Sequence, residues 1–198
     1  MTTKIKWIGK YNGSNLPEAD ISADAKLLPT ATGKSALAII PVLLAIFLFV
    51  YLKSIWDASV LFSKVNLAIG FGIGLLLFPV HELLHAICFP GRSEIVMYYT
   101  LQGLGTSCTA SVKRNRFILV NIFPSIVLGV IPLALFMVIP SSYVLAETIL
   151  FAVSFLHLGA GYADYSNVLH LMKIPPNAFV QISGEKIYWY LKEDDNIR

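Results

Sequence analysis

The chain has 198 residues, of which 56% are hydrophobic and only 14% are charged, and its mean hydropathy is +0.69. Soluble domains carry roughly 25% charged residues, so this composition excludes an ordinary soluble domain, and it is too apolar for a disordered chain. The formal net charge of +3 is too weak a surplus to indicate a nucleic-acid partner. We therefore expect an integral membrane protein.

Four apolar stretches are long enough to cross a bilayer, whose hydrocarbon core of about 30 Å needs about 20 residues of helix. Their expected ranges are 35–52, 65–90, 117–140 and 148–172. The segment before them has no apolar core followed by a small-residue cleavage site, so we expect the first span to be retained. The fold class predicted is an α-helical integral membrane protein with about four transmembrane helices.

The distribution of positive charge predicts the orientation, because cytoplasmic loops are enriched in Lys and Arg. Thirteen Lys and Arg fall in the segments 1–34, 91–116 and 173–198, whereas the opposite side has only Lys53 and Lys64. We therefore expect both termini in the cytoplasm. Cys88 and Cys108 would then lie at or near the reducing side, where a disulfide between them is not expected.

Three polar segments complete the predicted organisation: a cytoplasmic N-terminal segment over 1–34, a loop over 91–116 inside the membrane domain 35–172, and a C-terminal tail over 173–198. The loop contains β-prone residues 95–100 and then two glycines, a pattern typical of a hairpin. A second hairpin is possible in the tail, around Ser183-Gly184. Ile5 to Ile8 also has extended character.

The second stretch contains His81-Glu82-Leu83-Leu84-His85, the pattern H-E-x-x-H. Residues i and i+4 share one face of a helix, so His81 and His85 can bind one metal ion. Glu82 can then act as general base toward the attacking water. The structural alternative is a buried His–Glu cluster that only holds helices together. Ionisable side chains within a bilayer are costly, at about 2–3 kcal/mol or more each, and they persist when they pair, bind an ion or line a wet cavity.

A catalytic zinc site keeps three protein ligands and one open position. Asp164 is the candidate for the third ligand, since it lies about 13–14 Å from the boundary at Lys173, and His81 lies about 15 Å from its own boundary near Arg92. His157 and His170 match this depth less well. We expect His157 to be a core histidine and His170 to be an interfacial histidine. The alternative for Asp164 is a carboxylate solvated near a helix end.

Other residues of these stretches indicate packing. Gly70 and Gly74 have the small-x-x-x-small spacing of closely packed membrane helices. Pro79 can kink the helix and make room for water, or it can be an ordinary tolerated proline. Asn121 is expected to form an interhelical hydrogen bond, with contact to substrate as the alternative.

The H-E-x-x-H pattern inside an apolar stretch, with a late aspartate in another, resembles the site-2-protease type of intramembrane zinc metalloprotease. The chain resembles more closely a bacterial family of zincin-type membrane metallopeptidases recorded as a domain of unknown function. That family has about four spans, a small β-rich insertion after the motif helix and a Gly-rich segment ending in Asp. The resemblance covers roughly residues 35–191. One departure is that Asp164 stands in Tyr162-Ala163-Asp164-Tyr165 where site-2 proteases have Leu-Asp-Gly.

The resemblance implies that His81, His85 and Asp164 bind one Zn²⁺ ion and that Glu82 is the catalytic base. The implied protein is a multi-pass enzyme of the bacterial cell membrane, a zinc-dependent intramembrane endopeptidase acting on membrane proteins or membrane-bound peptides. Two alternatives remain open. One is an inactive relative that binds a metal or a membrane partner, and the other is a metal or proton transporter.

Overall fold

The computed structural model describes residues 4–29, 37–57, 62–91, 93–101 and 103–192. The predicted boundary residues Lys34, Ser35 and Arg92 lie outside these ranges. The chain divides into two compact units. The sheet unit comprises Met1–Ala31, Glu82–Asn121 and Asn167–Arg198, and the helix unit comprises Thr32–His81 and Ile122–Ser166. The boundaries between these units after His81, Asn121 and Ser166 fall inside helices.

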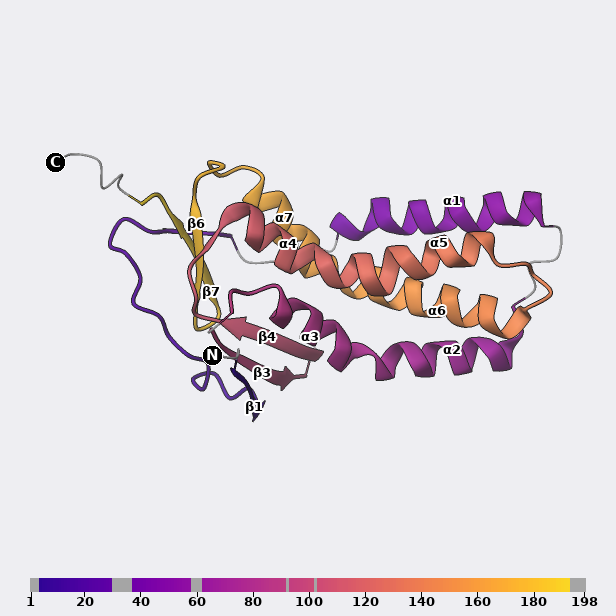
Figure 1. Ribbon diagram of the computed structural model, residues 1–198, viewed down its shortest axis with the longest axis horizontal. Coiled ribbons are helices and arrows are strands. Elements are labelled where there is room, and N and C mark those ends of the chain that lie inside the picture. The colour runs from indigo at the N-terminus through magenta and orange to yellow at the C-terminus, as the bar shows by residue number, and fades with distance from the viewer. Residues whose placement is uncertain (1–3, 30–36, 58–61, 92, 102, 193–198) are drawn as a thin grey trace. The chain divides into compact units, whose positions relative to one another are not determined.

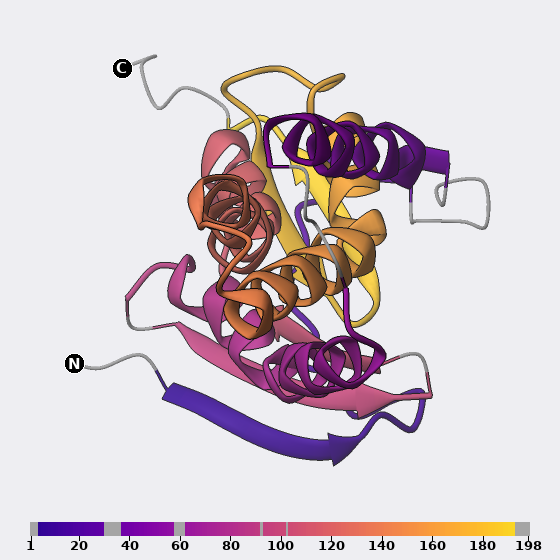
Figure 2. The same cartoon turned by 90° about the vertical axis from the view of Figure 1, so that its right-hand side faces the viewer.

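The helix unit is built around one central helix (Figures 1 and 2). Helix α6 (Val144–Ala160) contacts α1 (Ile40–Trp56), α2 (Lys64–Leu76) and α5 (Ile131–Val138). A π-helical turn, η2 (Ile126–Val130), leads into α5. The apolar core of this unit consists of four buried residues from three helices: Ile46, Leu133, Phe136 and Leu158.

Two glycines of α2 bring that helix against α6. A Cβ atom on Gly70 would lie 2.8 Å from the Cβ of Ala152 and 3.2 Å from the backbone of α6, and one on Gly74 would lie 2.6 Å from the side chain of Leu156. A side chain at Gly70 would therefore push the two helices apart. The predicted small-residue packing is seen at both positions.

Among the described residues, three helical segments, 37–56, 64–87 and 114–138, are long and apolar enough to cross a membrane by length and composition. The pair formed by α6 and α7 (Tyr162–Leu171) also qualifies if it counts as one span, with a bend of 50° between its two helices. The helices extend past the predicted limits: α1 continues beyond Lys53 to Trp56, and α6 begins at Val144, before Thr148. Lys53, just after the first apolar stretch, and Glu147, just before the fourth, therefore lie inside helices.

Lys53 and Glu147 can lie inside helices because they compensate each other. The Nζ atom of Lys53 lies 3.3 Å from Oε1 of Glu147, and the two side chains are 2% and 1% exposed. Lys53 also donates to the carbonyl oxygens of Phe136, in the last turn of α5, and of Ile139, the residue that follows this helix. A buried cation with an acid and two carbonyl partners avoids most of the penalty of an unpaired buried charge.

The sheet unit contains two small sheets. In the first, the order is β1 (Lys4–Lys10), β3 (Glu94–Thr100) and β4 (Gly103–Cys108). The antiparallel β3–β4 pair agrees with the hairpin predicted in the loop. Strand β1 runs parallel to β3, a pairing that the sequence did not predict.

The second sheet has the order β2 (Lys26–Leu27), β7 (Lys186–Tyr190), β6 (Phe179–Ser183) and β5 (Val112–Lys113). Strands β6 and β7 form the second predicted hairpin. The core beneath the sheets includes ends of three helices, α3 (Phe78–Ile87), α4 (Arg114–Ser125) and α7, and its buried residues are Leu28, Ala86, Phe89, Ile95, Cys108, Val112, Phe117, Val120, Leu171, Ile174, Ala178 and Val180. Cys108 and Cys88 are free thiols.

Candidate metal centre

The H-E-x-x-H motif lies on helix α3, which begins immediately after a break. Helix α2 ends at Leu76 and α3 begins at Phe78. Pro79 has no N–H to donate, and it lies in the first turn of the new helix, where this loss costs little. The backbone N–H of His81 donates to the carbonyl of Leu77 at 2.9 Å. Of the two alternatives for Pro79, a kink or an ordinary tolerated proline, the kink is favoured by the interruption of the helix at Leu77, just ahead of the motif.

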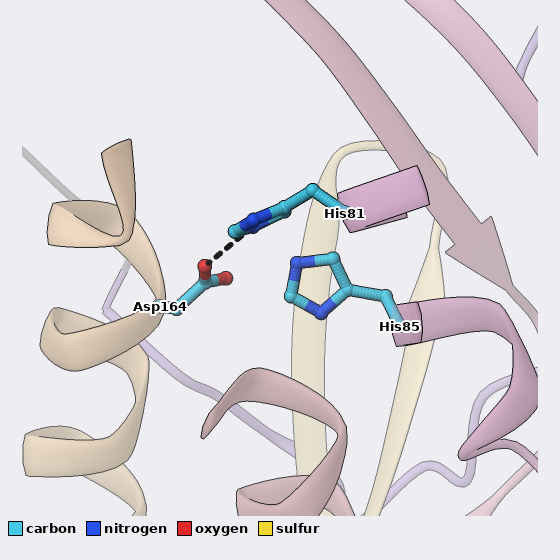
Figure 3. Close-up of side chains that lie close together, drawn as sticks. All are labelled: His81, His85 and Asp164. Carbon is cyan, nitrogen blue, oxygen red and sulfur yellow. Dashed lines mark ion pairs between the residues drawn. The ribbon is translucent and has the colours of Figure 1, made fainter. Parts of the chain in front are cut away.

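His81, His85 and Asp164 form a cluster with the donor chemistry of a metal site (Figure 3). His81 and Asp164 both belong to the helix unit, and Nε2 of His81 lies 3.9 Å from Oδ2 of Asp164. His85 is one turn farther along the same helix as His81. One ligand atom from each of the three residues lies within 4.8 Å of the others.

Asp164 reaches this cluster because the chain bends after α6. The bend of 50° falls at Gly161, between α6 and α7. A Cβ atom at Gly161 would lie 2.8 Å from Oγ of Ser125 and 2.9 Å from the ring of Tyr165. The Tyr165 hydroxyl donates to the carbonyl of Leu158, which ties the first turn of α7 back to α6, and it is hydrogen-bonded to the Ser125 hydroxyl as well. The carboxylate of Asp164 is 19% exposed.

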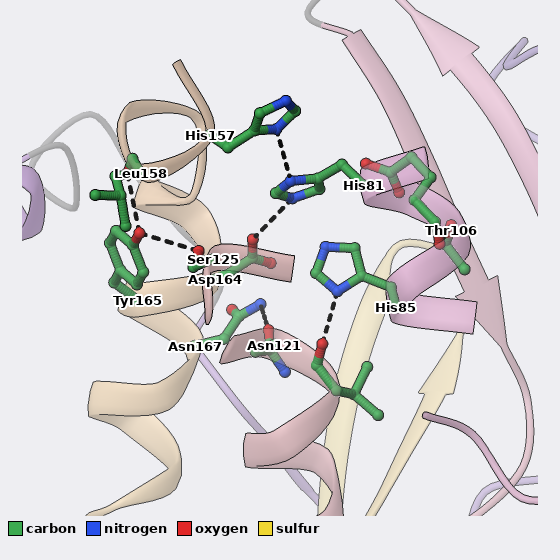
Figure 4. A network of polar contacts seen from close by, with 12 residues as sticks. His81, His85, Thr106, Asn121, Ser125, His157, Leu158, Asp164, Tyr165 and Asn167 are labelled. Atoms are coloured by element: carbon green, nitrogen blue, oxygen red, sulfur yellow. Dashed lines mark hydrogen bonds and ion pairs between the residues drawn. The ribbon is translucent and has the colours of Figure 1, made fainter. Parts of the chain in front are cut away.

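The Nδ1 atom of each motif histidine has its own partner (Figure 4). Nδ1 of His85 lies 2.7 Å from the carbonyl oxygen of Val120 in α4. Nδ1 of His81 lies 3.2 Å from Nδ1 of His157 in α6. His157 is a buried core histidine, as expected, but its bond to His81 was not predicted. Helical spacing could not have revealed it, because the two residues lie on different helices, 76 positions apart.

Glu82 is hydrogen-bonded through its backbone to the first sheet of the sheet unit. Its residue is 8% exposed, and its backbone carbonyl accepts a hydrogen bond of 3.1 Å from the Thr106 hydroxyl of β4. Tyr98, on the neighbouring strand β3, interacts electrostatically with it. Burial raises the pKa of Tyr98, and the charges of Glu82 and Glu185 raise this pKa further. Tyr98 therefore keeps its proton at neutral pH and can act as a hydrogen-bond donor there.

Asn121 has the interhelical bond that was expected of it. Its Nδ2 donates to the carbonyl of Phe117 at 2.7 Å within α4, and its Oδ1 accepts from Nδ2 of Asn167 in α7 at 3.0 Å. Both residues belong to the sheet unit. Asn121 is buried, with 4% of its surface exposed, and its hydrogen bond to Asn167 connects α4 to α7.

The chemistry of the donor set fits zinc. Two imidazole nitrogens and one carboxylate oxygen are the three protein ligands of one class of catalytic zinc site, which leaves a fourth position open. Zinc ligands stand about 2.0–2.2 Å from the metal, so an ion would draw the three side chains closer together. The His81 side chain is 5% exposed and that of Asp164 is 19% exposed, so Asp164 is the more accessible of these two residues.

A family model described as "Putative zincin peptidase" matches residues 74–179, more than half of the chain. The match includes the whole motif helix, the β3–β4 hairpin and Asp164. No curated protein and no solved structure matches the chain. Zincins are metallopeptidases that use zinc, and the matched segment contains the H-E-x-x-H pattern from which such enzymes take two of their ligands. The chain belongs to this family of zincin peptidases.

Proposed function

We propose that this protein is a zinc-dependent intramembrane endopeptidase that hydrolyses peptide bonds of membrane-associated substrates. The observation that carries the proposal is the cluster of His81, His85 and Asp164, with ligand atoms within 4.8 Å of one another and Glu82 beside it on the same helix. The residue roles are those of a zincin: His81, His85 and Asp164 hold one ion and Glu82 is the general base.

The membrane part of the proposal is supported by composition. The motif lies in the segment 64–87, and Asp164 lies just beyond the bend in the pair formed by α6 and α7; both pass the length and hydropathy requirements for a span. Ionisable residues within such segments mark functional sites. We therefore propose a hydrolytic centre below the surface of the bilayer, reached by water from the cytoplasmic side.

Each residue has a distinct task in the reaction. Zinc, when bound, supplies a Lewis acid that activates water and polarises the scissile carbonyl. His81, His85 and Asp164 fix the position of this Lewis acid. Glu82 accepts the proton of the attacking water and later donates it to the leaving amine. Tyr98, protonated at neutral pH, interacts electrostatically with Glu82.

Strand β4 supports an extended substrate beside the motif helix. Among the described strands, β4 pairs only with β3, and Thr106 connects it to the backbone of Glu82. An extended peptide can add to such an open strand edge through main-chain hydrogen bonds. A helical segment would have to unwind before it could bind, because the carbonyl and N–H groups of a helix already pair with each other.

The exchange of Glu82 for glutamine tests this function. We expect Glu82→Gln to keep zinc, because Glu82 is not a ligand, and to lose cleavage by about 10²–10⁴-fold, because the base is gone. The assay combines purified protein in detergent with casein and with single-span membrane peptides, and mass spectrometry identifies the products.

Glu94→Gln, on the exposed start of β3, is the matched control and should cleave like the wild type. Cleavage by Glu82→Gln at the wild-type rate would refute the mechanism, and zinc binding without cleavage by the wild type would favour the inactive relative.

A further inference from the structure

His157 is a wholly buried histidine that the proposed reaction does not use. It is 0% exposed and lies on α6, in the helix unit together with His81 and Gly74. Its ring stacks on that of His81, with centroids 5.3 Å apart and an angle of 17° between the planes, and the ring of Phe78 lies 5.0 Å away. Packing therefore leaves the imidazole of His157 little freedom to turn.

The hydrogen bonds of His157 determine which of its nitrogens carries the proton. Nε2 lies 3.1 Å from the carbonyl oxygen of Gly74, and a carbonyl can only accept a hydrogen bond. Nε2 must therefore be the N–H donor. In the neutral imidazole the other nitrogen, Nδ1, is then an acceptor.

The tautomer of His157 determines the tautomer of His81. Nδ1 of His81 lies 3.2 Å from Nδ1 of His157. Because the His157 atom accepts, the His81 atom must donate. The lone pair of His81 is then on Nε2, the nitrogen that faces Asp164 at 3.9 Å. A chain of two hydrogen bonds thus runs from the carbonyl of Gly74 through His157 to Nδ1 of His81. Figure 4 shows the second of these bonds.

His85 is held in the same tautomer, but by a single hydrogen bond to the backbone. Its Nδ1 lies 2.7 Å from the carbonyl oxygen of Val120, so Nδ1 donates and Nε2 has the lone pair. Partners of this kind fix the tautomer and the ring orientation of metal-ligating histidines, and their loss typically costs 10–100-fold in metal affinity.

We infer that His157 is a positioning residue of the metal centre, which holds His81 in the Nδ1–H tautomer with Nε2 directed at the metal position. The inference rests on the proposed function, since it takes His81 as a zinc ligand. The sequence alone gives His157 no such role, and its place depends on the close approach of α2 and α6 at Gly70 and Gly74.

Two substitutions of equal size separate this role from simple packing. Asparagine and leucine have the same shape, but only the amide oxygen of asparagine can accept a hydrogen bond in place of Nδ1. We expect His157→Leu to bind zinc about 10–100-fold more weakly than wild type and His157→Asn to recover most of this loss. The measurement is zinc affinity by competition with a chelator, and the visible spectrum of the Co²⁺-loaded protein reports the ligand geometry. His170→Leu removes a histidine of α7 outside the cluster and should leave both readouts unchanged.

The outcomes are distinct. Wild-type zinc affinity in His157→Leu, or equal weakening in His157→Leu and His157→Asn, would overturn the inference while leaving the proposed peptidase intact. Zinc bound normally by the wild type without any cleavage would overturn the proposed function and leave the inference standing. If His157→Leu does not fold, His157→Phe, which keeps an aromatic ring beside Phe78, carries the same expectation of weakened binding.

Discussion

At the scale of single residues, His81 and His85 are one turn apart on α3, yet different parts of the chain orient their rings. A backbone carbonyl of α4 holds His85, and a histidine of α6 holds His81. A carbonyl oxygen is always an acceptor, whereas Nδ1 of His157 is an acceptor only because Nε2 of the same ring donates to the carbonyl of Gly74. The position of His81 is therefore the more sensitive of the two to changes in helix packing.

Asp164 provides the strongest test of the ligand set. We expect Asp164→Asn to lose most of its zinc, because the neutral amide keeps the shape of the side chain but removes the charge that stabilises a divalent cation. His81→Ala and His85→Ala should lose zinc as well, since each removes one of three protein ligands. Metal analysis of the purified variants measures zinc per chain, with Asp20→Asn on the exposed N-terminal segment as the control. One zinc per chain in Asp164→Asn would exclude the aspartate as a ligand.

The sequence was sufficient to predict the motif and the candidate acid, but not the residue that orients His81. Helical spacing relates His81 to His85, and equal depth in two apolar stretches relates His81 to Asp164. His157 was expected about 10 Å farther out on the basis of its position along a straight helix. That estimate included neither the bend of 50° between α6 and α7 nor the close approach of α2 to α6 at Gly70 and Gly74.

At the scale of elements, glycine determines where the helices meet. Gly70 and Gly74 were recognisable from their spacing, and both contact α6. The ends of the helices were less predictable, because Lys53 and Glu147 look like boundary charges and are in fact a buried ion pair. Pairing between side chains 94 positions apart leaves no local pattern in the sequence, and the parallel β1–β3 contact is hidden for the same reason.

The packing of α2 on α6 can be tested with two neighbouring glycines. We expect Gly70→Ala to destabilise the protein by about 1–3 kcal/mol, because its Cβ would lie 2.8 Å from Ala152 and 3.2 Å from the backbone of α6. Gly72→Ala is the matched control: its Cβ would meet no atom within 4 Å, and alanine favours helix more than glycine does. Thermal unfolding in detergent compares the two variants. Equal midpoints would contradict the close packing at Gly70.

At the scale of the whole molecule, the proposed membrane topology depends on which helical segments cross the bilayer. Three helical segments, or four with the bent pair, are apolar and long enough, and their exposed residues include many large hydrophobic side chains, such as Phe47, Leu76 and Val138. Lys53 no longer counts as a loop charge, because it is buried in α1. The asymmetry of the loop charges therefore becomes stronger, which supports the proposal that both termini lie in the cytoplasm.

Single cysteines can test this orientation in intact cells. In a background of Cys88→Ala and Cys108→Ala, we expect a membrane-impermeant maleimide to label Ser142→Cys, an exposed position between α5 and α6, because that turn carries no Lys or Arg and should face outward. Lys186→Cys, exposed at the start of β7, should react only after the cells are lysed, because the tail is expected inside. The two positions serve as controls for each other, since both are exposed and differ only in the side predicted. The reverse pattern would invert the proposed topology and place the open side of the metal centre toward the exterior. Labelling of both cysteines before lysis would be incompatible with a four-span arrangement that has both termini inside.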